Sequence, residues 1–320
     1  MTRRRSGSLL TFFLLTFAVM WTLYFTVVAA SIPAGSLPGR ILILLGAYSP
    51  GIVALGLTTR AEGAAGLRTL LGRIVQWDVA AKWYVFAVSY LAAIKLSAAV
   101  IHRAITGAWP RFGAEPLFLI PLAIAFSTPF QAGEEIGWRG YALPRMAARL
   151  GLARASLLLG LVWAVWHLPQ FFIRDGDSYG QSFFVFVLQV VPLTVAMAWL
   201  FAHTGGSLLP VMVMHAAVNN SSGIVPSAVP DGTDMFALSA SSTTLVGWLT
   251  VALLWICAAW FLAHMPRFSP ELGMNLASRP RVGGADELGF SDVTNRFGSR
   301  PPCAGSLADA GGGESGTPPG

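Results

Sequence analysis

The stretch FFVFVLQVVPLTVAMAWLFA, residues 183–202, decides the fold class of this sequence. It contains no Asp, Glu, Lys or Arg. A helix needs about 20 apolar residues to cross the hydrocarbon core of a membrane. The stretch therefore predicts a transmembrane helix.

The whole chain has the composition that such a helix implies. Of its 320 residues, 54% are hydrophobic and 11% are charged, whereas about a quarter of the residues of a soluble domain are charged. We expect an all-α integral membrane protein, a bundle of about eight transmembrane helices. Besides 183–202, the predicted crossings are 8–30, 41–57, 83–101, 117–136, 155–173, 244–263 and a short one at 208–218.

The cations between these crossings predict the orientation. Loops on the side of the amino terminus contain Arg60, Arg68, Arg73, Lys82, Arg145, Arg149 and Arg154, whereas residues 220–243 contain no Lys or Arg. Positive loops stay in the cytoplasm, which predicts a multi-pass protein of the cell (plasma or inner) membrane with both termini cytoplasmic. The net charge of +6 suits an anionic inner leaflet of the lipid bilayer. No basic and aromatic array indicates a nucleic acid partner.

Four regions follow along the chain. Residues 1–115 hold N-terminal transmembrane helices, with an interfacial helix near 66–77, where apolar and basic positions alternate at near-helical spacing. Residues 116–222 hold most of the intramembrane polar residues, and 223–265 an external loop and the last transmembrane helix. Residues 266–320 are polar and rich in Gly and Pro, which predicts a disordered cytoplasmic tail.

Ionisable residues inside apolar helices are the candidates for chemistry, because each costs several kcal/mol unless it is paired or functional. The candidates are Lys95, Glu134, Glu135, Arg139, His167 and His215, with Asn219 and Asn220 as polar companions.

Two adjacent acids differ in their sequence neighbours. Glu135 and Arg139 are four residues apart, with the acid on the amino-terminal side, which favours an ion pair on one helix face. Glu134 points about 100° away round the helix and has no nearby cation in the sequence. Glu134 is therefore the candidate general base. The alternative is that both acids are structural, held by Arg139 and Arg145.

Each histidine shares a helix face with a second residue. Trp163 and His167 are four residues apart, as are His215 and Asn219. An amide beside an imidazole can stabilise a developing oxyanion, although hydrogen bonding between helices explains either residue equally well. If the chain turns at Gly151, Glu134 and His167 lie at similar depths, each about 25 Å from the turn at 1.5 Å rise per residue.

Three ordered motifs resemble those of the type II CAAX prenyl endopeptidases and their bacterial relatives, the CPBP intramembrane protease family. They are Glu134-Glu135-x-x-x-Arg139, Trp163-x-x-x-His167 and His215-x-x-x-Asn219. The resemblance covers about residues 117–220. One departure is Trp163, where the family more often has Phe.

The resemblance implies an intramembrane endopeptidase whose catalytic core is 116–222 and whose site opens toward the cytoplasm. Glu134 would activate the attacking water and His167 would help to hold it. His215 and Asn219 would stabilise the oxyanion, supported by Glu135 and Arg139. The implied partner is a membrane-anchored peptide or protein substrate, including prenylated CAAX-type substrates.

Other chemistries remain open from the residues alone. A non-catalytic transporter or scaffold could use the same Glu and His residues, and Ser207 could act as a nucleophile beside a histidine.

Zinc is a possible cofactor, since Glu134, His167 and His215 supply two imidazoles and one carboxylate. Zinc would, however, occupy Glu134, the obvious base. We therefore favour a mechanism without metal or other cofactor.

Overall fold

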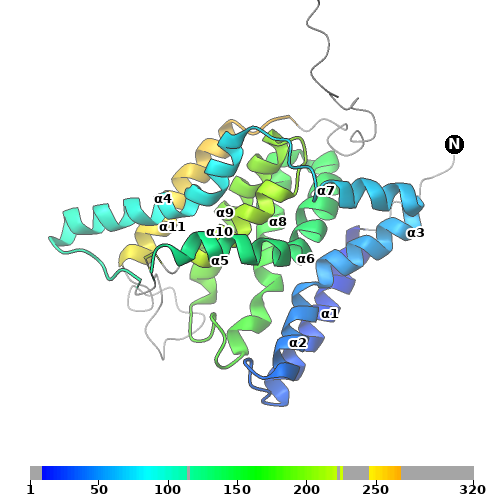
Figure 1. The fold of residues 1–320 in the computed structure, drawn as a ribbon, viewed down its shortest axis with the longest axis horizontal. Coiled ribbons are helices and arrows are strands. Elements are labelled where there is room, and N and C mark those ends of the chain that lie inside the picture. The colour runs from blue at the N-terminus through cyan, green and yellow to red at the C-terminus, as the bar shows by residue number, and fades with distance from the viewer. Residues whose placement is uncertain (1–8, 114–115, 222–223, 226–244, 268–320) are drawn as a thin grey trace, which may run out of the picture. The chain divides into compact units, whose positions relative to one another are not determined.

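The computed structural model describes residues 9–113, 116–221, 224–225 and 245–267, in which every regular element is helical (Figure 1). The predicted all-α class is confirmed. Most of the predicted external loop and nearly all of the predicted tail lie outside the described residues.

The α-helices are α1 Leu9–Ala29, α2 Leu37–Ala47, α3 Ser49–Gly72, α4 Ala81–Thr106, α5 Leu119–Ser127, α6 Ala132–Glu135, α7 Leu143–Leu150, α8 Leu152–Trp166, α9 Phe183–His203, α10 Leu209–Asn220 and α11 Leu245–Ala263. Two 3₁₀ turns, η1 Thr128–Gln131 and η3 Leu168–Phe172, and a π-helix, η2 Ile136–Ala142, complete the described elements.

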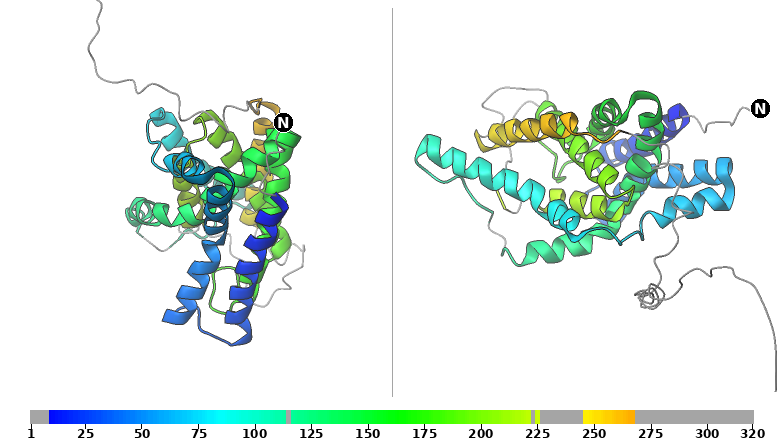
Figure 2. Two further views of the ribbon diagram at one scale, coloured as in Figure 1. Left: turned by 90° about the vertical axis from the view of Figure 1, so that its right-hand side faces the viewer. Right: turned by 90° about the horizontal axis from the view of Figure 1, so that it is seen from above.

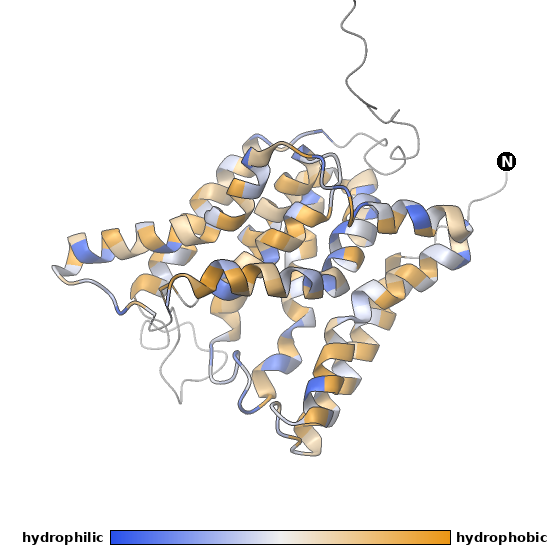
Figure 3. Cartoon of the chain, viewed as in Figure 1, coloured by the Kyte–Doolittle hydropathy of each residue, from blue (hydrophilic) through white to orange (hydrophobic). Residues whose placement is uncertain are grey.

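The predicted count of eight crossings is not confirmed. In the described ranges, 5 helices are long and apolar enough to cross a membrane, or 6 if the bent pair α2 and α3 counts as one span. Figure 3 colours the hydrophobic residues of these helices orange. The predicted crossing 117–136 divides instead into α5, η1 and α6, because Pro129 in η1 cannot continue an α-helical hydrogen-bond ladder. Helix α10 has 12 residues, fewer than the roughly 20 that a full crossing needs.

The acid-bearing segment is one continuous helical ridge, α6 to η2 to α7, held against the start of α3. A Cβ on Gly137 would lie 2.5 Å from the backbone carbon of Pro50, and one on Gly51 would lie 2.7 Å from the Gly133 carbonyl oxygen. Only glycine permits this approach, so the two backbones are in direct contact. π-Helical turns inside α-helices occur frequently at functional sites, and η2 begins directly after Glu135.

The ridge ends at Gly151, whose φ of 76° is favourable only for glycine. Helix α8 begins at the next residue and packs against α7. The chain therefore turns where the depth estimate assumed it would, and α8 carries Trp163 and His167 back toward Glu134.

The remaining helices position His215. Helix α9 packs between α8 and α11, and α10 packs against α4 and α5; Figure 2 shows these helices from two further sides. A loop with positive φ at Gly205 and Gly206 leads from α9 into α10. Most of α10 is buried, His215 included.

Candidate active site

Glu135 joins two helices through one oxygen. Its Oε1 accepts a hydrogen bond from Arg139 Nη1 at 2.9 Å and lies 2.8 Å from His215 Nδ1. The side chains of Glu135 and Arg139 are completely buried and that of His215 is 5% exposed. The i,i+4 ion pair is therefore present, and it also anchors α10, a link that sequence spacing did not indicate.

Glu134 has different neighbours. Its Oε2 accepts a hydrogen bond from Trp163 Nε1 at 2.8 Å and lies 3.9 Å from His167 Nε2. Its side chain is 13% exposed, and that of His167 is 10% exposed. In the described part of the chain, neither Arg nor Lys forms an ion pair with Glu134.

The hydrogen bonds of the two imidazoles assign their tautomers. His167 Nδ1 lies 2.7 Å from the Trp163 carbonyl oxygen, which can only accept, so this nitrogen carries the hydrogen. His215 Nδ1 likewise donates to the Glu135 carboxylate. In the neutral form, each ring therefore has its lone pair on Nε2.

Trp163 lies at the centre of the cluster. Its ring meets those of His167 and His215 edge to face, with centroids 5.2 and 5.3 Å apart. The Arg139 guanidinium carbon lies 4.2 Å from its ring centroid. Spacing predicted only the contact with His167. The hydrogen bond to Glu134 requires an indole N–H, which the phenylalanine more common at this position does not have.

A cavity of about 170 Å³ adjoins these rings. Trp163, His167, His215 and Asn219 line it, and Lys95 of α4 lines it as well. Asn219 is exposed, whereas its neighbour Asn220 donates to Ser127 and to the Ala216 carbonyl. Glu134 is not part of the cavity wall and lies beyond Trp163 and His167. The sequence singled out Lys95 as an intramembrane ion but not as part of the site.

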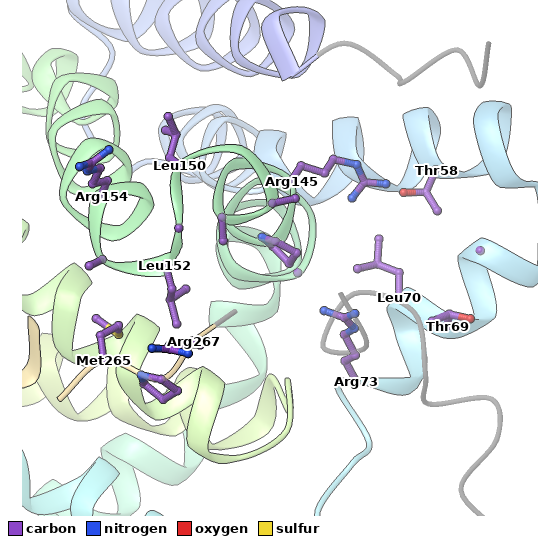
Figure 4. A pocket seen from close by; sticks show the side chains of 18 of the residues that line it. Thr58, Thr69, Leu70, Arg73, Arg145, Leu150, Leu152, Arg154, Met265 and Arg267 are labelled. Carbon is purple, nitrogen blue, oxygen red and sulfur yellow. The ribbon is translucent and has the colours of Figure 1, made fainter. Parts of the chain in front are cut away.

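A larger cavity, of about 770 Å³, shares no lining residue with the one beside His167 and His215. Figure 4 shows Arg73, Arg145, Arg154 and Arg267 around it. Arg145 forms an ion pair with Glu62 at 2.7 Å. Burial and the nearby charge of Arg145 lower the pKa of Arg73 to about 10. Arginines that are far apart in the sequence thus line one cavity.

The described residues contain no group of three His, Cys, Asp or Glu side chains arranged to hold a metal ion. Glu134 lies near His167, whereas His215 is held by Glu135. The possible zinc set of Glu134, His167 and His215 and the metal-free mechanism both stay predictions.

Comparisons with known proteins identify the class. Residues 114–221 match the family model described as Rce1-like, type II CAAX prenyl endopeptidase. The CAAX prenyl protease 2 of Methanococcus maripaludis is 27% identical over an alignment of 225 residues, and the match covers 65% of this chain and 81% of that protein. The chain is therefore a membrane-embedded peptidase. The match of residues 114–221 to the Rce1-like model, together with the similarity to a CAAX prenyl protease 2, confirms the resemblance seen in the three motifs.

Proposed function

We propose that the protein is an endopeptidase that hydrolyses a peptide bond in a membrane-anchored peptide or protein, prenylated CAAX-type substrates included, with a water activated by Glu134. One observation carries this proposal. Glu134 Oε2 and His167 Nε2 are two acceptors that face each other at 3.9 Å. One water can donate to both acceptors, because a hydrogen bond from a water oxygen to an acceptor atom spans about 2.8 Å.

The reaction then uses Glu134 twice. Its carboxylate takes a proton as the water oxygen attacks the carbonyl carbon, while His167 Nε2 accepts from the other O–H and orients the water. When the C–N bond breaks, Glu134 passes the proton to the leaving amine. Trp163 holds the carboxylate at the required position through its 2.8 Å hydrogen bond.

The oxyanion of the tetrahedral intermediate is bound by His215 and Asn219, and not by Glu134 and His167. Glu135 holds His215 through Nδ1, and the proposal uses this ring in its imidazolium form. That form has a second N–H, on Nε2, which can donate to the oxyanion together with the Asn219 amide. Because Glu135 and Arg139 neutralise each other, the proton on His215 adds positive charge where negative charge develops.

The test is hydrolysis of a fluorogenic, prenylated CAAX-type peptide by purified protein in lipid nanodiscs. We expect Glu134→Gln to lower kcat by about 10²- to 10⁴-fold, the usual range for a general base. Glu62→Gln is the matched control, because Glu62 is a half-exposed acid paired with Arg145 away from the rings. A Glu134→Gln enzyme as fast as the wild type would overturn the proposal. The same peptide without its prenyl group tests whether the lipid is required.

We propose in addition that the protein lies in the cell membrane with both termini in the cytoplasm. The gathering of Arg73, Arg145, Arg154 and Arg267 supports one strongly positive end. Helix α8 runs from that cavity to the smaller one beside His167 and His215, taken here as the catalytic cavity, because its first turn lines the larger cavity and Trp163 lines the smaller. Helix α11 lines the larger cavity with Leu262 and the smaller with Thr250 and Leu254. In this orientation the catalytic cavity lies nearer the outer face, whereas the family resemblance implied an opening toward the cytoplasm.

Cysteine labelling decides the orientation. Arg149→Cys and Arg111→Cys replace exposed residues in a protein freed of Cys257 and Cys303. A membrane-impermeant maleimide should label Arg111→Cys in intact cells, and Arg149→Cys only after permeabilisation. The reverse pattern would place the arginine-rich end outside.

A further inference from the structure

Lys95 is a buried cation that the proposed mechanism does not use. It lies in the middle of apolar α4, is 7% exposed, and lines the catalytic cavity together with His167, His215 and Asn219. A charged side chain at such a position is costly and is a functional candidate by default.

The contacts of Lys95 leave most of its donors unassigned. Its Nζ donates to the Val225 carbonyl oxygen at 3.1 Å, and an ammonium has three hydrogens to donate. Among the described residues Lys95 forms no ion pair, and the cavity wall contains no Asp or Glu. The other polar groups of the wall include Gln189, Ser221 and Thr250, which are neutral. The cavity is therefore suited to a substrate group with a negative charge.

A peptide offers two kinds of carboxylate, one at its C-terminus and those of Asp and Glu side chains. The cavity measures about 170 Å³, less than the roughly 300 to 1,000 Å³ of ordinary ligand sites. A volume of this size suits a short chain end better than a peptide that runs through it.

We propose that Lys95 binds the C-terminal carboxylate of the substrate, and so restricts cleavage to a bond close to the chain end. This inference rests on the proposed function, since it assigns the cavity beside His167 and His215 to the part of the substrate that follows the cleaved bond. Helix α4 packs against α10, so the carboxylate site and the oxyanion donors are held on adjoining helices.

The experiment compares two peptides of one sequence, one ending in a carboxylate and one in a carboxamide. For the wild type, kcat/KM should be about 10- to 100-fold higher for the acid, the range of a hydrogen bond to a charged group. Lys95→Met should remove this preference by lowering the rate on the acid alone, and Lys95→Arg should restore part of it. Lys82→Met is the control, because Lys82 is an exposed lysine at the start of the same helix.

Equal cleavage of acid and amide by the wild type would overturn the role of Lys95 and leave the peptidase proposal intact. Equal loss on both peptides in Lys95→Met would do the same, since it would indicate a structural lysine. Binding to inactive Glu134→Gln protein, read from the shift in its melting temperature, gives a measure that needs no turnover. Stronger binding of the acid, abolished by Lys95→Met, would support the inference even if neither peptide is cleaved, an outcome that would instead count against the proposed function.

Discussion

Glu134 and Glu135 are neighbours in α6, but their side chains have different surroundings. Glu135 is completely buried and its Oε1 is shared by Arg139 and His215. Glu134 is partly exposed, and its Oε2 has a neutral donor, Trp163, and a histidine nitrogen across a 3.9 Å gap. One carboxylate thus has two hydrogen-bond donors on a single oxygen, and the other has one donor and an acceptor opposite it. A rotation of about 100° round the helix is therefore enough to give two adjacent carboxylates different partners.

The largest expected effect is on the buried side of this comparison. Arg139→Ala leaves Glu135 as a buried carboxylate without its main partner, which typically costs about 3 to 5 kcal/mol. We expect little folded protein, measured as the yield of monodisperse material and its thermal unfolding midpoint in detergent. Arg149→Ala, which removes an exposed arginine of α7, should fold normally. A stable and fully active Arg139→Ala protein would contradict the structural role.

A smaller effect is expected on the other side. Trp163→Phe keeps an aromatic ring against His167 and His215 but removes the N–H that Glu134 accepts. Loss of a hydrogen bond to a charged group is worth roughly 1.5 to 3 kcal/mol, so kcat should fall at least about tenfold, with a small change in the unfolding midpoint.

Trp255→Phe is the control for this variant, because its indole donates to the Leu188 carbonyl away from the site. If Trp163→Phe were as fast as the wild type, the indole would have only a packing role.

The smallest effect is expected from removal of metal. Zinc would need Glu134 as a ligand. Glu134 would then not be free to act as a base, and its difference from Glu135 would be lost. We expect exhaustive chelation to leave the rate unchanged and elemental analysis of active protein to find no stoichiometric metal. One zinc per chain, with activity lost on chelation and restored by zinc, would replace the metal-free mechanism while keeping the peptidase.

The parts of the site that were predictable are those that helix geometry determines locally. The Glu135–Arg139 pair and the Trp163–His167 contact each span four residues, and the facing of Glu134 and His167 follows from rise per residue and the turn at Gly151. Periodicity within one helix is sufficient for the two pairs, and the rise per residue is sufficient for the shared depth of Glu134 and His167.

The contacts between distant helices were not predictable in this way. The links from Glu135 to His215 and from Trp163 to Glu134 depend on how α10 and α8 are rotated against α6, which one sequence does not specify. The predicted count of eight crossings is not confirmed for a related reason. Hydropathy registers an apolar stretch such as 117–136, but not the break that begins at Pro129.

The most direct test of the division between the two acids is a paired measurement of kcat and thermal unfolding midpoint for Glu134→Gln and Glu135→Gln. We predict that Glu134→Gln keeps a midpoint close to that of the wild type and loses about 10²- to 10⁴-fold in kcat. Glu135→Gln should lower the midpoint, because Arg139 becomes a buried cation without a counter-charge. The opposite pattern, an unstable Glu134→Gln and a stable but inactive Glu135→Gln, would contradict the account and make Glu135 the base.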